Sequence, residues 1–539
     1  MTSPTPRAGA MPASVVLLLL WLLATLLNLN KAFHIDDTFH LEAAQWIEHH
    51  PLQPMSGTIN WGGESEPMHA FNQPPLYFYF IAIVGHFFGY TELPLHLFQS
   101  VFTFLCIYFF YRIAQLVQPR HALLLTAFFV LNPAFLVNQN LMVDIPLLSF
   151  HLLFIYFLIA PGIRSGWVRY GMAGVFLSVA LLIKYTSLPL LALLLLVPLL
   201  RKHYAGLLAV LVPIGVLAAW TAFNYAEFGA AHIINRPTNT LTLYGVLRMS
   251  ALFILCLSTI VPYFLVLALG YPGCWRRYCN ILAVITISGF FLVAIAAYQG
   301  ILDIRIANRV HYAFVTINGL VLTFVLIKET FRYHTDLQKL ASDSSIVLLW
   351  LLVLAGFLIL FAPFMATRHV LLCLPAMLLL TAGALNKLPR LNRGLALFFA
   401  FAISLLVGIS DWIYADAFRK QAFAIRESLP AQARVWTVGN WGWQWYSRNA
   451  GMLPYDEKIS EPAPGDYVVI PAHIAQQDVS AQLKLKQVGA EQENGQALTF
   501  FSNAPLAGLY TSWEQKIPWN FSKGPIARFK IYRVVQVAD

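Results

Sequence analysis

The chain has 539 residues, of which 58% are hydrophobic and only 11% are charged. A soluble globular domain carries about 25% charged residues, so this composition excludes a water-soluble body of this length and indicates a membrane protein. The formal net charge of +10 does not indicate a nucleic-acid partner, because the basic residues lie in short loops between apolar runs, as in the cytoplasmic loops of membrane proteins.

The apolar runs predict a polytopic α-helical membrane protein with about 13 transmembrane helices, since a helix that crosses the bilayer needs about 20 mostly apolar residues. The first run, near residues 13–30, has no small-residue cleavage site after it and is interpreted as an uncleaved span rather than a signal peptide. The remaining spans are predicted at 95–116, 121–139, 145–161, 168–183, 186–200, 204–224, 250–270, 280–298, 311–328, 345–362, 370–386 and 394–411.

The charged loops predict how the chain is oriented. One set of alternate loops is basic and contains Arg120, Arg201 and Lys387, whereas the other set contains acidic residues such as Asp144 and Glu227. The positive-inside rule therefore places the N-terminus in the cytoplasm. The acidic loops and the C-terminal segment are expected on the outer, periplasmic face of the cell inner membrane.

A long first outer loop, residues 31–94, follows from this orientation. Within it, the stretch from Pro74 to Tyr90 is apolar and aromatic but short for a span. Counting it as a span would reverse the sidedness of every later loop. It is therefore predicted to be an interfacial helix that lies at the membrane surface.

The composition changes after Asp411, where polar and charged residues become frequent. We therefore predict a membrane domain over residues 1–411 and a small outer α/β domain over residues 412–539. The aromatic cluster from Trp441 to Tyr446 could stack on a sugar, but packing at the membrane interface is favoured. In the outer domain we expect an amphipathic helix at 413–429 and strands at 434–438, 467–470, 498–501 and 529–537.

Three acidic residues are candidates for catalysis. Asp36 and Asp37 follow the first span, where desolvation and mutual repulsion raise the pKa of a carboxyl group. Such a pair suits a general base that takes a proton from an acceptor hydroxyl, although an ordinary solvated acidic pair is the alternative. Asp144 lies between two predicted spans, where a carboxylate in an apolar run marks a functional site, caps a helix, or does both.

Basic residues at predicted outer turns are candidates for anion binding. Lys184 interrupts an apolar run, and Arg368 with His369 precedes the twelfth predicted span. Each cation could bind a lipid phosphate or simply extend to the membrane surface. Arg236 is a weaker candidate of the same kind. No metal site is predicted, because the one close pair of cysteines has no second Cys or His pair near it.

Taken in order, these segments resemble the GT-C glycosyltransferases, and more narrowly the bacterial protein O-mannosyltransferases and the lipid A aminoarabinose transferases. The resemblance covers the first ~200 residues best, about the length of one ordinary domain. The matching segments are residues 36–38 with 42–44, 71–77, 141–146 and 184–186, and Arg368–His369 followed by Pro375.

The resemblance implies an inverting glycosyltransferase that takes a hexose or pentose from a polyprenyl-phosphate carrier, such as undecaprenyl phosphate. No tightly bound cofactor is implied, and the partners are membrane lipids and a glycan, lipid or protein acceptor. A transporter or flippase, or a non-catalytic protein of envelope assembly, remains the alternative. However, we find no paired repeats of the kind that many transporters contain.

The same resemblance assigns roles to individual residues. It maps the catalytic base onto Asp36, with Asp37 and Asp144 as further acidic residues of the site. Gln73 departs from the family, which usually has His or Lys there, and a neutral amide cannot neutralise a lipid phosphate. The donor phosphate is therefore assigned to Lys184, Arg368 and Arg236, and the donor or acceptor pocket to Gln73, Tyr77, Tyr185 and His369.

Overall fold

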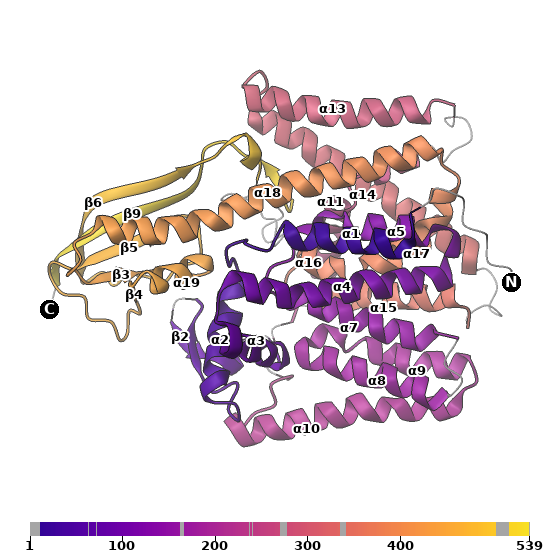
Figure 1. Ribbon diagram of the computed structural model, residues 1–539, viewed down its shortest axis with the longest axis horizontal. Coiled ribbons are helices and arrows are strands. Elements are labelled where there is room, and N and C mark those ends of the chain that lie inside the picture. The colour runs from indigo at the N-terminus through magenta and orange to yellow at the C-terminus, as the bar shows by residue number, and fades with distance from the viewer. Residues whose placement is uncertain are drawn as a thin grey trace.

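A large helical body carries a small sheet domain at one end (Figure 1). This computed structural model describes residues 11–537 except 63, 72, 162–165, 235, 237, 240, 270–276, 335–340 and 503–516. Asn72, part of the segment 71–77 that carries the family resemblance, thus lies outside the described residues.

The helical body is built from apolar helices that match the predicted spans. Among the described residues, eight helices are long and apolar enough to cross a membrane: α4 (Glu92–Val117), α8 (Gly166–Ile183), α10 (Leu211–Phe228) with the 3-10 turn before it, α11 (Leu243–Ile260), α13 (Cys279–Gln299), α14 (Ile304–His334), α15 (Asp343–Phe361) and α18 (Arg390–Ser428). Shorter apolar helices are α1 (Ala13–Leu26), α3 (Leu76–Phe88), α5 (Ala122–Val130), α7 (Asp144–Ile159), α9 (Leu190–Leu200) and α17 (Leu374–Asn386).

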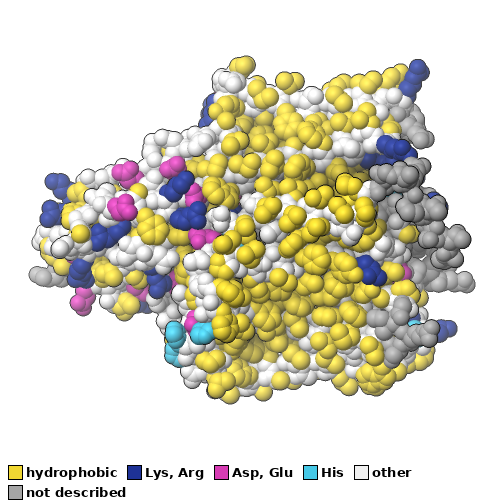
Figure 2. Space-filling view, in the orientation of Figure 1, with side chains coloured by type: hydrophobic (Ala, Val, Ile, Leu, Met, Phe, Trp, Pro, Cys, Tyr) yellow, Lys and Arg dark blue, Asp and Glu magenta, His cyan; other side chains and the backbone are white. Residues whose placement is uncertain are grey.

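Each predicted span overlaps one of these helices, and α3 is the stretch predicted to be interfacial. The span predicted at 250–270 is wrong in its bounds, because α11 ends at Ile260 and a separate short helix, α12 (Phe264–Ala268), follows it. The polytopic helical fold is therefore confirmed, while the number of spans stays a prediction. The surface agrees with a membrane location, because hydrophobic side chains cover the helical body and charged side chains gather near its two ends (Figure 2). Leu292, Leu320 and Phe324 are more than half exposed, which would be costly in water.

The C-terminal sheet confirms an α/β arrangement. Its strands are β3 (Val435–Thr437), β4 (Leu453–Pro454), β5 (Tyr467–Pro471), β6 (Leu483–Asn494) and β9 (Pro525–Val537), in the order β4-β3-β5-β9-β6. Strand β3 is parallel to β4 and β5, whereas β9 is antiparallel to both of its neighbours.

One strand prediction needs correction, and one long strand was missed. Residues 498–501 do not form one strand: Ala497–Thr499 is a 3-10 turn, and β7 (Phe501–Ser502) pairs with β8 (Asn520–Phe521) in a separate small sheet. Strand β6 was not predicted at all. It lies at the edge of the main sheet, and its apolar alternation is confined to Leu483 and Leu485. From Gln487 onward most of its residues are exposed and polar or small, so this part lacks the pattern that marks a half-buried strand.

Helix α18 connects the two parts of the molecule. It runs from the helical body into the sheet domain without a break (Figure 1), and no proline occurs between Pro389 and Pro430 to end it. The predicted helix at 413–429 is the second half of α18. The division at 411–412 therefore falls inside a continuous helix, and a boundary there remains a proposal.

The segment of residues 31–94 packs against this sheet domain. It contains α2 (Asp37–His49), the hairpin of β1 (Thr58–Asn60) and β2 (Ser65–Pro67), and α3. The aromatic cluster forms helix α19 (Gly442–Asn449) and faces this segment. Trp443, Trp445 and Tyr446 are buried there, so packing rather than an open sugar platform explains them.

Candidate active site

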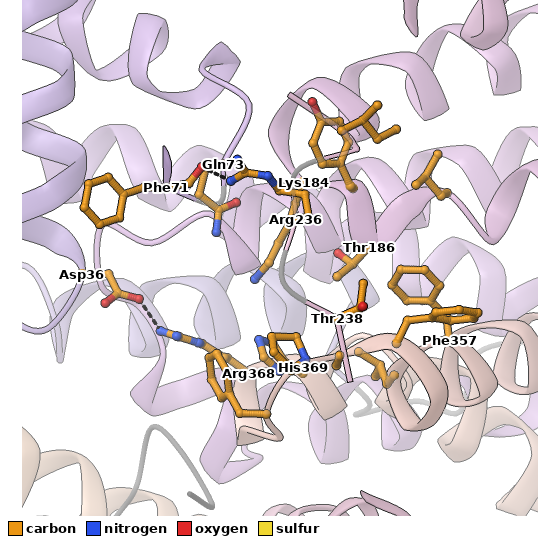
Figure 3. A pocket seen from close by; sticks show the side chains of 18 of the residues that line it. Asp36, Phe71, Gln73, Lys184, Thr186, Arg236, Thr238, Phe357, Arg368 and His369 are labelled. Carbon is orange, nitrogen blue, oxygen red and sulfur yellow. Dashed lines mark hydrogen bonds and ion pairs between the residues drawn. The ribbon is translucent and has the colours of Figure 1, made fainter. Parts of the chain in front are cut away.

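A cavity of about 420 Å³ lies beside the first residues of α2. One end of the cavity is polar: Asp36 and the three basic side chains Lys184, Arg236 and Arg368 point toward a common space (Figure 3). The other end is apolar and includes Phe357 of α15. Seven of the predicted site residues line it: Asp36, Gln73, Lys184, Tyr185, Arg236, Arg368 and His369.

Asp36 ends the turn between α1 and α2, directly before the first helical residue. Its carboxylate accepts a hydrogen bond from Nη1 of Arg368 at 2.7 Å, and the two groups form an ion pair (Figure 3). The Asp36 side chain is 30% exposed, whereas that of Arg368, on α16 (Thr367–Leu371), is 10% exposed. The candidate base is therefore open to the cavity but already holds a cation.

Asp37 occupies a different environment from its neighbour. It is 1% exposed and does not line the cavity. One of its carboxyl oxygens accepts a hydrogen bond from the backbone N–H of His34 at 2.8 Å. Burial raises the pKa of Asp37 to about 8, so this carboxyl group is mostly protonated at neutral pH. The side chains of the two adjacent acids thus point to different places, one to the cavity and one to the interior, and they differ in charge.

Lys184 and Asp144 form a second ion pair, with a distance of 2.9 Å between Nζ and Oδ1. Both side chains are nearly buried. Asp144 is the first residue of α7 and does not line the cavity itself, so it acts on the cavity through Lys184. Lys184 precedes a 3-10 turn, Tyr185–Ser187, that breaks the apolar run between α8 and α9. The lysine therefore faces the cavity because the helix ends there.

Arg236 is held by backbone rather than by an acidic side chain. Its guanidinium donates hydrogen bonds to the carbonyl oxygens of His232 at 2.9 Å, His69 at 2.8 Å and Phe71. Among the ion pairs between described residues, none joins Arg236 to a carboxylate. Its positive charge is thus balanced only by carbonyl dipoles, which makes it a strong candidate for an anion partner.

The histidines of the cavity add no charge. Burial lowers the pKa of His40 to about 4, and burial lowers the pKa of His369 as well. Three cations and the carboxylates of Asp36 and Asp144 therefore leave a net charge of +1 around the cavity. A site with this balance favours a ligand that carries one negative charge.

Tyr77, like Asp37 and Asp144, does not line the cavity, whereas Tyr185 lines it and is engaged in a hydrogen bond there. Tyr77 is fully buried, and its hydroxyl donates a hydrogen bond to Oε1 of Gln99 at 2.5 Å. Its ring turns toward α4 because it lies on the face of α3 that packs there, so the assignment of Tyr77 to the pocket is corrected. Tyr185 lines the cavity, and its hydroxyl accepts a hydrogen bond from Trp220 Nε1 at 2.8 Å.

Several lining residues were not predicted. His40 follows Asp36 by four residues on α2, so helical spacing could have placed both on one face. Trp61 comes from the β1–β2 hairpin, and Phe361 from the end of α15. Nothing in the sequence separates these aromatic residues from the many others in apolar segments.

Comparison with known proteins supports the family resemblance over part of the chain. Residues 72–224 match a family model described as dolichyl-phosphate-mannose-protein mannosyltransferase. The resemblance to these glycosyltransferases is thereby confirmed for a segment that contains Gln73, Asp144 and Lys184, whereas Asp36 and Arg368 lie outside it. No curated protein matches the chain.

Solved structures resemble the chain at low identity. ArnT from Cupriavidus metallidurans, bound to undecaprenyl phosphate, is 13% identical, with 85% of this chain and 92% of that chain covered and a TM-score of 0.39. The oligosaccharyltransferase AglB from Archaeoglobus fulgidus, in complex with an inhibitory peptide and a dolichol-phosphate, is 13% identical, with 85% and 69% covered and a TM-score of 0.46. With TM-scores below 0.5, neither likeness bears on substrate or mechanism.

Proposed function

We propose that the protein is an inverting glycosyltransferase that moves a hexose or pentose from a polyprenyl-phosphate donor to an acceptor hydroxyl at the outer face of the membrane. The observation that carries this proposal is the cavity itself. A carboxylate and three cations meet at its polar end, and aromatic and aliphatic side chains form the rest. A phosphate and sugar fit the polar end, and the polyprenyl chain fits the apolar end.

The charge balance supports a donor with a single phosphate. A polyprenyl-phosphate sugar is a phosphodiester and carries one negative charge, which matches the net +1 around the cavity. A diphosphate carrier would bring two negative charges. Arg236 is the natural first partner of the donor phosphate, because Lys184 and Arg368 are already paired with carboxylates.

Asp36 is the general base in the proposed reaction. It takes the proton of the acceptor hydroxyl while the acceptor oxygen bonds to the anomeric carbon and the bond from that carbon to the phosphate oxygen breaks. Attack from the face opposite the phosphate inverts the anomeric centre. The released polyprenyl phosphate gains the negative charge that Asp36 loses. Arg368, whose Nη1 lies 2.7 Å from Oδ2 of Asp36, is placed to stabilise the carboxylate before the reaction and the leaving phosphate after it.

The decisive experiment uses the purified protein in liposomes with defined polyprenyl-phosphate sugars. We expect the donor lipid to be cleaved and the sugar to appear on an acceptor, or on water when no acceptor is present. A flippase would move the lipid without cleaving it, and an assembly protein would do neither. An intact donor with every hexose and pentose tested would overturn the proposal. Mass spectrometry of cell-envelope glycans, with and without the protein, would then identify the acceptor.

The donor class is tested by competition. Polyprenyl monophosphate should inhibit transfer better than the diphosphate of the same chain length. In the variant Arg236→Gln, donor affinity should fall by about tenfold or more, as expected for the loss of a charge-assisted hydrogen bond. Arg236→Lys, which keeps the charge but loses the planar contacts to the carbonyl oxygens, serves as the matched control and should bind donor better than Arg236→Gln.

The proposal includes an orientation. The acidic loops and the C-terminal domain lie outside, and the N-terminus lies in the cytoplasm. A topology reporter fused after Asp539 should therefore report an outer location, and a cytoplasmic location would contradict this orientation.

A further inference from the structure

The backbone directly before Asp36 is strained. Ile35 has a φ of +53°, in the left-handed region. A β-branched residue seldom adopts this conformation, because its side chain crowds the following carbonyl oxygen. Such a conformation persists only where surrounding contacts hold it. The contacts around Ile35 therefore decide where Asp36 points.

A turn of the C-terminal domain supplies contacts on both sides of Ile35. Gly442 packs directly on the backbone before it: a Cβ added to Gly442 would lie 2.4 Å from the carbonyl oxygen of Phe33. After it, Thr38 Oγ1 donates a hydrogen bond to the carbonyl oxygen of Trp441 at 2.6 Å. Trp441 is itself left-handed, with a φ of +65°. Two strained residues that are not glycine thus belong to one interface.

Further contacts fix this turn to the segment of residues 31–94. The hydroxyl of Tyr446 accepts a hydrogen bond from the backbone N–H of Phe33 at 2.7 Å and donates one to Glu92 at 2.6 Å. Asn440 Nδ2 donates to the carbonyl oxygen of Trp61 at 3.0 Å, and Trp61 lines the cavity. The C-terminal domain therefore holds the backbone of Trp61 directly and holds Asp36 through its neighbours Phe33 and Thr38.

We propose that Trp441 and Gly442 are positioning residues: their turn holds Phe33 and Thr38 so that Ile35 stays left-handed and Asp36 faces Arg368 and the donor. This inference rests on the proposed function of Asp36. It gives the C-terminal domain a part in catalysis without contact with the substrate, since neither Trp441 nor Gly442 lines the cavity.

The test compares two glycine variants in the full-length protein. In Gly442→Ala, the new methyl group must displace the Phe33 carbonyl and, with it, Asp36. Because a misplacement of about 1 Å can cost about 10²-fold in rate, kcat should fall by up to that factor while donor affinity stays near wild type. Gly489→Ala is the matched control, because its added Cβ would make only an ordinary contact, 3.5 Å from Ile531.

A fall in kcat with donor affinity retained is a readout that a general loss of packing would not produce. When Asp36 moves away from Arg368, the proposed base is misplaced while the cations that hold the donor stay in the cavity. Thr38→Val, which removes one hydroxyl at almost constant shape, should lower kcat in the same way by a smaller amount. If Gly442→Ala does not fold, Thr38→Val decides the question.

The outcomes separate this inference from the proposed function. A wild-type protein that transfers no sugar contradicts the proposed function. A wild-type protein that transfers sugar, together with a Gly442→Ala variant whose kcat matches that of Gly489→Ala, overturns the positioning role. A Thr38→Val variant with an unchanged kcat does so as well.

Discussion

The segment between α1 and α2 contributes to an ion pair on each of its two sides, and the two pairs differ in their surroundings. On the cavity side, Asp36 pairs with Arg368, and the Asp36 side chain is 30% exposed. On the buried side, Lys31 pairs with Asp411 of α18, and their side chains are 1% and 0% exposed. Lys31 also donates a hydrogen bond to Oδ1 of Asn140 at 2.7 Å.

This difference separates a pair that a ligand can open from one that it cannot. A phosphate that enters the cavity can compete for Arg368, because the new contact replaces the old one. Nothing can replace the partner of Asp411 in a dry interior without a large desolvation cost. Similar ion pairs thus differ in their roles: the Lys31–Asp411 pair fixes the segment to α18, whereas the Asp36–Arg368 pair is the one that we propose takes part in the reaction.

Loss of the buried pair should have the largest effect on stability. Lys31→Met leaves Asp411 without its lysine and should reduce the free energy of unfolding by about 3–5 kcal/mol. The double variant Lys31→Met with Asp411→Leu should recover much of this loss. Lys420→Met, which breaks an ion pair whose lysine side chain is 68% exposed, is the control and should cost less than about 1 kcal/mol. Denaturation in detergent measures all three, and equal losses for Lys31→Met and Lys420→Met would refute the contrast.

Loss of the cavity pair should instead act on the reaction. In the proposed reaction Arg368 stabilises the negative charge that forms on the leaving phosphate. Arg368→Met should therefore slow transfer by about 10²–10³-fold. Arg368→Lys should retain part of the rate. A single-turnover rate of Arg368→Met close to wild type would show that this arginine does not stabilise the leaving group.

The smallest effect on activity is expected at Asp37. Asp37→Asn should slow transfer by less than about tenfold, below the range for the loss of a general base. A more specific test of Asp37 is how the free energy of unfolding depends on pH. The pKa of Asp37 is about 8 in the folded protein and ~3.9 in an unfolded chain, so between these values the folded state binds more protons. Wild-type stability therefore falls as the pH rises through this window.

The asparagine variant lacks this proton equilibrium. The unfolding midpoint of Asp37→Asn, measured against that of the wild type, should therefore rise steadily as the pH increases from about 5 to about 8 and then level off. A difference that is constant over this range would show that Asp37 is not held protonated in the folded protein.

Hydropathy predicted the membrane body well, because each predicted span overlaps a helix and the bilayer permits little else, but the run at 250–270 is divided between α11 and the short α12. The sheet domain was predicted less completely. Strand β6 alternates leucine with lysine only over Leu483–Lys486 and is mostly polar after that, at an exposed edge. The change of composition at Asp411 does not mark the end of α18, which continues to Ser428.

Part of the candidate site could be predicted from charged residues that lie in apolar segments of the sequence. Asp36, Lys184 and Arg368 could be singled out because each interrupts an apolar context, and the structure brings all three to one cavity. Their pairing could not be predicted, since Asp36 and Arg368 are 332 positions apart. The difference between Asp36 and Asp37 could not be predicted from the sequence either, because only the fold decides which of two adjacent carboxylates faces the cavity.

The assignment of the base to Asp36 is tested most directly by single-turnover transfer from a purified polyprenyl-phosphate sugar, with Asp36→Asn and Asp37→Asn measured side by side. Donor binding is measured separately, so that a loss of rate is not confused with a loss of affinity. Asp36→Asn keeps the shape of the side chain and removes the proton acceptor, so it should lower the rate by about 10²–10⁴-fold with donor binding retained. Near wild-type turnover in Asp36→Asn, or a dead Asp37→Asn beside an active Asp36→Asn, would contradict the assignment.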